Sequence, residues 1–193
     1  DAWLTLGGLA ALAHGALAQD IGAVGTYQSC VVANLAGSSG NISLHDGVHT
    51  FQQALTAGNG GNGTLVATLT ANATCNGALN IGLAPSGSGL VRTIGPGVVT
   101  ANAGVGVGGS PTASGGTGTL KAEIGGVINV SGLFRVWANG TVLAQSSGVV
   151  NSASTIELRP GGVAQVDGGT ISGPAVVLTG SSSAAGTGAA LTG

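Results

Sequence analysis

The chain has 193 residues, of which 39 are glycine and only 5% are Asp, Glu, Lys or Arg. Its four basic residues cannot form the positive surface that binding to nucleic acids or to anionic lipids requires. The mean hydropathy of +0.49 and the formal net charge of −2 exclude the common type of disordered chain, in which low hydropathy accompanies high net charge. A β-rich protein of small residues with little charge is typical of extracellular structural material.

An almost uncharged apolar run, from Ala2 to Ala18, lies at the start of the sequence. It resembles a secretory signal, in which an apolar stretch is followed by small residues, here residues 16–18, before Gln19. It also fits a segment that stays in the mature protein and packs between the subunits of a filament, either as a helix or as a donor strand. Both interpretations predict export from the cytoplasm. The side chains expected to make the subunit contacts are Trp3, Leu4, Leu6, Leu9, Leu12 and Leu17.

The body of the chain reads as short strands separated by glycine-rich turns. Residues 26–35 are rich in apolar and β-branched side chains, and residues 64–70 alternate apolar with polar, as a half-buried strand does. Turn dipeptides such as Asn139-Gly140 recur, and strands spaced by about 8–12 residues are typical of a sandwich or barrel. We therefore predict an all-β domain, an antiparallel β-sandwich or barrel-like fold. A β-solenoid is the alternative for the tract from Ile124 onward, although no fixed repeat length supports it.

Three regions are expected along the chain. Residues 1–20 form the apolar assembly segment or the remnant of a signal, and residues 21–180 form the β-rich domain. Within this domain, residues 95–118 combine two prolines with many Gly, Ser and Thr, which predicts a long loop or a weak strand pair. Residues 181–193 have the composition of a flexible tail, unless a neighbouring subunit orders them.

The two cysteines are expected to form a disulfide. No Cys-x-x-Cys motif or Cys/His cluster indicates zinc, and in an exported protein the simplest pairing joins Cys30 to Cys75 across 44 intervening residues. By the loop-entropy model such a bond contributes about 3–4 kcal/mol. Two buried free thiols are the alternative.

Five Asn-x-Ser/Thr sequons exceed what this composition produces by chance, and they support a glycan-bearing surface outside the cell. Their use requires a host that attaches N-glycans, such as a eukaryote or an archaeon. The acceptors would be Asn41, Asn62, Asn72, Asn129 and Asn139.

The titratable residues cluster once, at His45-Asp46-x-x-His49. On an extended strand both imidazoles would point to one face, where they could bind a transition metal or act as an acid–base pair. Asp46-Gly47 reads as a turn, however, and no third ligand is evident in the sequence. We therefore expect two surface histidines beside a turn, and predict no metal or other cofactor.

Other patterns give no support for catalysis, and no enzyme is predicted. The sequence has no nucleophile elbow, no phosphate-binding lysine and no close pair of carboxylates. Arg135 near Trp137, and Glu157 near Arg159, are interpreted as surface or cross-strand contacts. Two glycine patterns of the nucleotide-binding type follow from composition, since neither begins an amphipathic helix: Gly58-x-Gly60-x-x-Gly63 and Gly104-x-Gly106-x-x-Gly109.

The layout of the chain, with its apolar N-terminal segment, Thr/Ser/Gly-rich β body, sequons and few charges, is similar to that of extracellular filament subunits. By this layout archaeal type IV pilins are the nearest group. Thr5 stands where bacterial type IV pilins typically have a glutamate, a departure that argues against the bacterial subfamily. The resemblance implies a cell-surface glycoprotein that assembles with identical subunits into a pilus or similar fibre, and contacts the membrane only transiently. The alternative is a monomeric secreted or wall-anchored adhesin with a cleaved signal, which binds carbohydrate.

Overall fold

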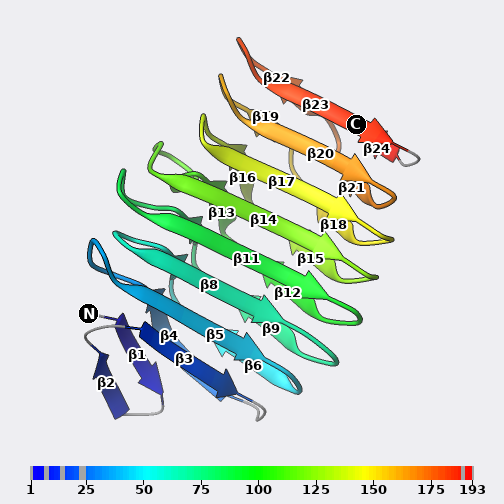
Figure 1. Ribbon diagram of the computed structural model, residues 1–193. Coiled ribbons are helices and arrows are strands. Elements are labelled where there is room, and N and C mark those ends of the chain that lie inside the picture. Colours follow the sequence, from blue (N-terminus) through cyan, green and yellow to red (C-terminus); the bar gives the residue numbers. More distant parts are fainter. Residues whose placement is uncertain (1, 7–8, 14–15, 22–24, 188–189, 193) are drawn as a thin grey trace.

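In a computed structural model, the chain winds into a β-solenoid of about 7 turns (Figure 1). The structure describes residues 2–6, 9–13, 16–21, 25–187 and 190–192, and the side chains of residues 25–186. A typical turn contributes one short strand to each of three faces that run along the axis. Strands that are far apart in the sequence therefore lie side by side.

Face 1 is an eight-stranded sheet in which every neighbouring pair of strands is parallel. Its order follows the chain, because each strand pairs with its equivalent in the next turn. The strands are β3 (Ala16–Ile21), β5 (Ser39–Leu44), β8 (Asn62–Ala67), β11 (Ser88–Ile94), β14 (Thr117–Glu123), β17 (Gly140–Gln145), β20 (Val163–Asp167) and β23 (Ser183–Thr187).

Faces 2 and 3 are joined by β4 (Gly25–Val32), which pairs with a strand of face 2 at its start and with a strand of face 3 at its end. Face 2 contains β6 (Val48–Phe51), β9 (Asn72–Cys75), β12 (Val98–Ala101), β15 (Val127–Val130), β18 (Val149–Ser152), β21 (Thr170–Ser172) and β24 (Ala190–Thr192). Face 3 contains β7 (Leu55–Ala57), β10 (Leu79–Ile81), β13 (Gly104–Val107), β16 (Leu133–Val136), β19 (Ile156–Leu158) and β22 (Val176–Leu178).

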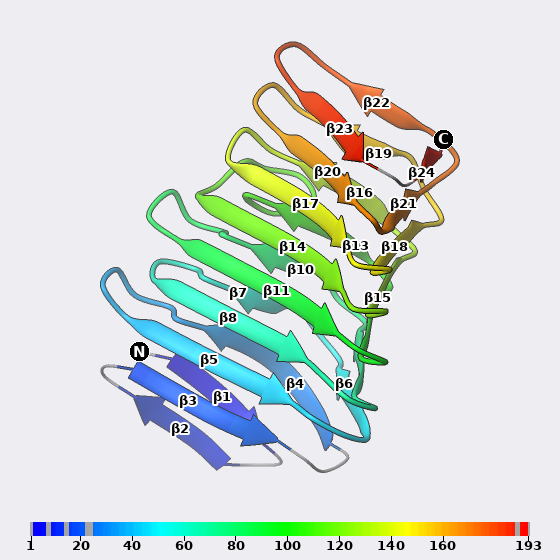
Figure 2. The same ribbon diagram turned by 45° about the vertical axis from the view of Figure 1, so that its right-hand side comes forward.

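The predicted antiparallel sandwich or barrel is wrong, because the strands from β3 onward pair in parallel. Among the described strands, the antiparallel pairs are the hairpin of β1 (Ala2–Leu6) with β2 (Leu9–Ala13) and the pairing of β1 with β4 (Figure 2). Short alternating strands joined by glycine-rich turns occur both in antiparallel hairpins and in the turns of a parallel solenoid. The local sequence pattern therefore could not distinguish the two folds. A pilin-like β-sandwich is thereby excluded as well.

The described residues of the N-terminal apolar segment lie in the strands β1, β2 and β3 rather than in a helix, and β1 pairs with β4 of the same chain. No helix among the described residues is long and apolar enough to cross a membrane. At the other end, β23 pairs with β20 within the region that was expected to be a flexible tail. Assembly into a filament stays a prediction, because its expected contacts lie outside the described side chains: Trp3, Leu4, Leu6, Leu9, Leu12 and Leu17.

Side chains that point inward form columns along the axis, because the strands are parallel and in register. Each buried Val or Leu contributes about 1.5–3 kcal/mol, and every turn adds such residues to the same column. In one such column, the rings of Tyr27 and Phe51 stack with their centroids 5.0 Å apart. On face 1 a column with no member more than 2% exposed runs through Ile42, Leu65, Val91, Leu120, Val142 and Ala164.

A column of glycines lies where face 3 leads into face 1. A Cβ atom on Gly89 would lie 2.2 Å from the Ala57 carbonyl oxygen, and one on Gly118 would lie 2.2 Å from the Gly108 nitrogen. These neighbours are backbone atoms that cannot move without disturbing the ladder. Glycine is therefore required for this corner to close, and the column comprises Gly40, Gly63, Gly89, Gly118 and Gly140.

The substitution Gly118→Ala should destabilise the protein by about 1–3 kcal/mol or more, because the new methyl group overlaps backbone on two sides. Gly186→Ala is the matched control, since its Cβ would make only ordinary contacts, the nearest at 3.6 Å, and we expect a change within about 0.5 kcal/mol. Urea unfolding followed by circular dichroism measures both. Equal stability of the two variants would contradict the packing role of the glycine column.

Candidate functional site

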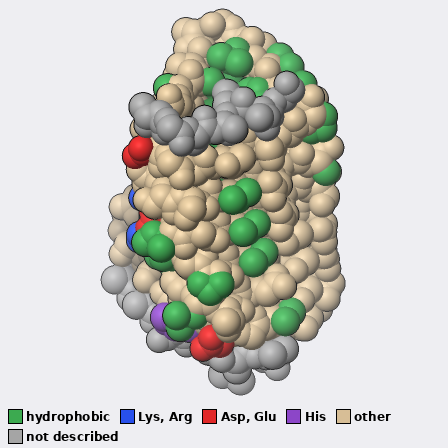
Figure 3. All heavy atoms as spheres, turned by 90° about the vertical axis from the view of Figure 1, so that its right-hand side faces the viewer, with side chains coloured by type: hydrophobic (Ala, Val, Ile, Leu, Met, Phe, Trp, Pro, Cys, Tyr) green, Lys and Arg blue, Asp and Glu red, His purple; other side chains and the backbone are tan. Residues whose placement is uncertain are grey.

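Charged side chains are scarce on the surface, and most of the described ones gather in two groups. Figure 3 shows one side of the molecule, on which hydrophobic side chains form a row and charged ones appear only near its left edge and lower end. On face 1, Arg92 and Lys121 both pair with the buried Glu123. On face 3, Arg135 and Arg159 both pair with Glu157.

The group on face 3 is built by neighbouring strands in register. Arg135 on β16 pairs with Glu157 on β19, and Glu157 pairs in turn with Val177 on β22. Arg159, one residue beyond β19, donates its amide to the carbonyl of Val136 at the end of β16, at 2.8 Å, so the ladder continues. Outward side chains of these three turns therefore form a small grid on one flat surface.

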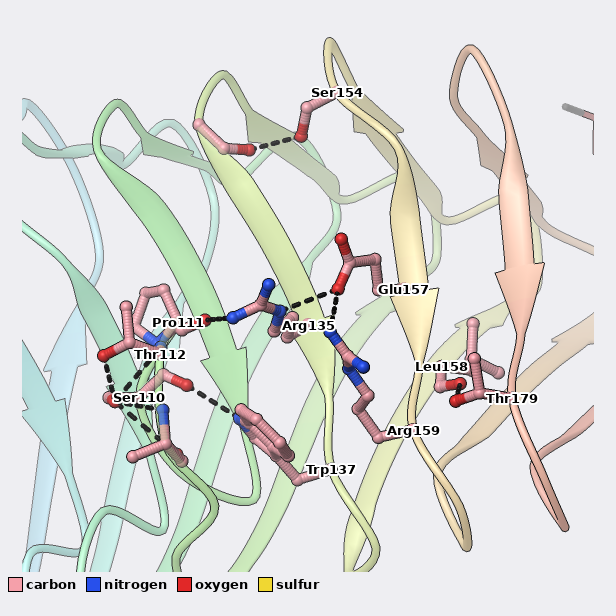
Figure 4. A network of polar contacts seen from close by, with 12 residues as sticks. Ser110, Pro111, Thr112, Arg135, Trp137, Ser154, Glu157, Leu158, Arg159 and Thr179 are labelled. Carbon is pink, nitrogen blue, oxygen red and sulfur yellow. Dashed lines mark hydrogen bonds and ion pairs between the residues drawn. The ribbon is translucent and has the colours of Figure 1, made fainter.

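Hydrogen bonds hold this grid in place (Figure 4). The Arg135 Nε and the Arg159 Nη2 each donate to the Glu157 Oε2 at 2.7 Å. The carbon between the guanidinium nitrogens lies 5.9 Å from the Trp137 ring centroid for Arg135 and 5.8 Å for Arg159, close enough for cation–π attraction. These groups form a connected cluster, which we call the tryptophan cluster: Arg135, Trp137, Glu157 and Arg159.

A strap, residues 109–115, forms one wall of the tryptophan cluster. The Ser110 carbonyl accepts from the Trp137 Nε1 at 2.7 Å, and the Pro111 carbonyl accepts from the Arg135 Nη1 at 3.0 Å. The strap can lie this close because β13 has glycine at its outward positions: a Cβ on Gly106 would lie 2.1 Å from the Ser110 carbonyl carbon. Both glycine patterns therefore have packing roles, since Gly63 of the other pattern belongs to the glycine column.

The charge of Glu157 is stabilised by its neighbours. The hydrogen bond from Arg135, and the positive charges of Arg135 and Arg159, lower the pKa of this carboxyl below its ordinary value. Arg135 and Arg159 both donate to the Oε2 atom of Glu157. Within the described residues, the Oε1 atom is therefore left to accept a hydrogen bond from a ligand. The cluster thus presents an ionised carboxylate and two guanidinium groups.

A cavity of about 280 Å³ lies beside Arg159, on the side away from Trp137 along the grid. One of its hydroxyls, Thr179 Oγ1, donates to the Leu158 carbonyl at 2.8 Å. Hydroxyl, carboxylate and guanidinium groups beside one apolar side chain suit a small polar ligand. The cavity is lined by Thr155, Glu157, Arg159, Val177 and Thr179.

Comparison with known proteins identifies no relative. No family model, no curated protein and no solved structure matches this chain. Function must therefore be argued from the chain's own side chains.

The two histidines do not form a metal site with other described residues. His49 is fully buried on β6, where its Nε2 donates to the Asp46 carbonyl at 2.8 Å and its Nδ1 lies 3.2 Å from the Tyr27 hydroxyl. His45 lies in the turn before β6, with its Nδ1 3.0 Å from the Thr68 hydroxyl. No group of three or more His, Cys, Asp or Glu that could hold a metal occurs among the described residues. The turn was expected, but the buried position of His49 was not.

Cys30 and Cys75 are both buried free thiols in the structure. Phe51 pairs with Tyr27 on one side and with Cys75 on the other, so the turn that carries Phe51 separates the turns of the two cysteines. Two steps between strands span roughly 9 Å, more than the separation across a disulfide. The structure therefore does not join the two sulfurs. Burial raises the pKa of the Cys30 thiol to about 12 and that of the Cys75 thiol to about 11.

The five sequon asparagines all lie on strands or turns with at least partly accessible side chains. Asn129 also accepts a hydrogen bond from Asn151 at 3.1 Å on face 2. Attachment of glycans stays a prediction for Asn41, Asn62, Asn72, Asn129 and Asn139.

Sequence reasoning treated the tryptophan cluster as two separate contacts. Arg135-x-Trp137 and Glu157-x-Arg159 have the same spacing and lie 22 residues apart, which is the offset between β16 and β19. This shared offset was the one feature of the sequence that indicated that the two pairs are neighbours. Without knowing that one turn of the solenoid is 22 residues long there, the match could not be distinguished from chance.

Neither cysteine should react with Ellman's reagent in the native protein at pH 8, because a thiol of pKa about 11 is ionised in only about one molecule in a thousand at that pH. Both thiols should react in concentrated guanidinium chloride. A Ser88→Cys variant, with its new thiol at an exposed position, is the control and should react at once. If no thiol appears in denaturant without a reductant, the cysteines form a disulfide after all.

Proposed function

We propose that this protein is an extracellular surface protein whose solenoid presents a carbohydrate-binding site at the tryptophan cluster. The single observation that supports it is that Glu157 and Arg159 line a cavity of about 280 Å³ on a sheet face, while Trp137 packs against Arg159 on the other side of the same cluster. In a chain with 5% charged residues, this grouping is a strong local departure from the composition.

The chemistry of the cluster matches that of a sugar. A sugar ring has an apolar face of C–H groups, which packs on an indole ring, and hydroxyls at its rim, which both donate and accept hydrogen bonds. Trp137 is half-buried and supplies the aromatic surface, while the Glu157 Oε1 can accept and the arginines can donate. A cavity of this size has the volume of about nine water molecules, enough for one sugar ring. Because Trp137 lies on the other side of Arg159, the ligand is an oligosaccharide that places one ring in the cavity and a neighbouring ring on the indole.

The site is also rigid before any ligand arrives. Its side chains stand on paired strands, and the strap and Glu157 fix both Trp137 and Arg135 through hydrogen bonds. Little side-chain freedom is left to lose on binding, which favours the weak, specific contacts that sugars make. Export to the cell surface is part of the proposal and is supported by the composition and the sequons.

The substitution Trp137→Ala should weaken the binding of an oligosaccharide about tenfold or more, because the aromatic surface is lost. A glycan array first identifies a bound oligosaccharide, and calorimetry then compares the variant with the unaltered protein. Lys121→Ala is the matched control: it alters the charged group on face 1 while Glu123 keeps its partner Arg92. Circular dichroism verifies that each variant is folded.

Two outcomes would contradict the proposal. Either no oligosaccharide binds to the folded protein, or one binds equally well to the Trp137→Ala variant.

A further inference from the structure

We infer that the tryptophan cluster selects acidic sugars, those that carry a carboxylate or a sulfate, and that Arg159 holds the acidic group. This inference rests on the proposed function, since it names the class of sugar that the same site takes. It depends on the charge of the site, on the unused donors of Arg159 and on the position of the cavity.

The site carries a net positive charge, from two arginines and one glutamate. Among the described side chains, residues 25–186, the remaining charged ones lie on face 1 or in the corner that follows it: Asp46, Arg92, Lys121, Glu123 and Asp167. No second carboxylate on face 3 opposes an incoming anion in the part of the chain that the structure describes.

The two arginines are used differently. Arg135 donates to Glu157 and, on its other side, to the Pro111 carbonyl of the strap. Arg159 donates to Glu157 through Nη2, while its Nε is buried and has no acceptor in the described part of the chain. Its side chain is 35% exposed and lines the cavity. Arg159 rather than Arg135 is therefore the arginine whose terminal guanidinium donors face a ligand in the cavity.

An oxyanion matches those donors better than a hydroxyl does. A guanidinium group binds carboxylate or sulfate oxygens through charge-assisted, often paired hydrogen bonds, which are stronger than bonds to neutral oxygens. Glu157 holds the guanidinium of Arg159 from one side, so it is a positioning residue rather than a direct ligand for the anion. Thr155 and Thr179 line the same cavity and place hydroxyls within reach of the sugar ring.

A cationic sugar is disfavoured by the same contacts. Glu157 is the carboxylate at the site, and both arginines already share its Oε2. An ammonium group would have to compete with two guanidinium groups for one carboxylate.

The test compares matched pairs of probes on the folded full chain by calorimetry. One pair is tri-galacturonic acid and its neutral methyl ester, and the second is a sulfated galactose oligosaccharide and its desulfated form. We expect the acidic member of at least one pair to bind about tenfold more tightly, and added salt to reduce this difference. The two pairs separate a carboxylate ligand from a sulfate ligand.

The substitution Arg159→Gln should remove the preference for the acidic probe while leaving weak binding of the neutral one. Arg159→Lys, which keeps the charge but not the planar group, should retain part of it. Lys121→Gln on face 1 is the control and should change neither affinity. If circular dichroism shows that Arg159→Gln is unfolded, the affinities of Arg159→Lys and the effect of salt on the preference for the acidic probe replace it as the test.

The outcomes separate this inference from the proposed function. If neutral and acidic probes bind equally, with an affinity that still depends on Trp137, the choice of acidic sugars is overturned and carbohydrate binding stands. If no probe on a broad glycan array binds, both are overturned. A preference for acidic probes that survives Arg159→Gln would overturn the role of Arg159.

Discussion

The close approach of backbone to backbone at one corner is the constraint on which the solenoid depends. Where face 3 leads into face 1, the chain passes so near to the next strand that a Cβ on Gly63 would lie 2.4 Å from the Val32 carbonyl oxygen. The same approach recurs at Gly89, Gly118 and Gly140, one turn after another. Amide hydrogen bonds such as Gly82 to Ala57, at 2.9 Å, extend the ladder through the corner. The abundance of glycine is thus a requirement of this geometry, since any side chain there would separate the turns.

A ladder in register also explains why the chain carries so little charge. Each side chain of a parallel solenoid stands directly beside its equivalent in the next turn, where like charges repel. Arg92 and Lys121 are such neighbours, and both depend on Glu123 to compensate them. Arg135 instead has Glu157 as its neighbour, an attractive pair. Uncharged polar side chains avoid the problem, as when Asn151 donates to Asn129.

The sequence predicted many of the strands but not their pairing. Of the predicted strand 64–70, residues 64–67 lie in β8 and residues 68–70 belong to the turn that follows it, while the turn at Asp46-Gly47 separates β5 from β6 as expected. The pairing was hidden because the repeat varies in length: Ser39 pairs with Asn62, Ser88 with Thr117 and Thr141 with Val163, offsets of 23, 29 and 22 residues. Corner loops absorb these differences, so no fixed period appears in the sequence. The candidate site could not be predicted for the same reason, since its residues come together only through the pairing of β16 with β19.

The longest of these offsets belongs to the turn that contains the strap, and this links the irregular repeat to the candidate site. An insertion at a corner leaves the ladders on both sides intact, so its cost is mainly that of ordering a loop. Here the loop is ordered by lying on Gly106 of β13, and two of its carbonyls then fix Trp137 and Arg135. Residues 95–118, which the sequence predicted as a long loop or a weak strand pair, contain both β12 and β13 and this strap. The interruption of the repeat therefore supplies the wall that a uniform solenoid face would lack, and it does so beside the group of charges on face 3.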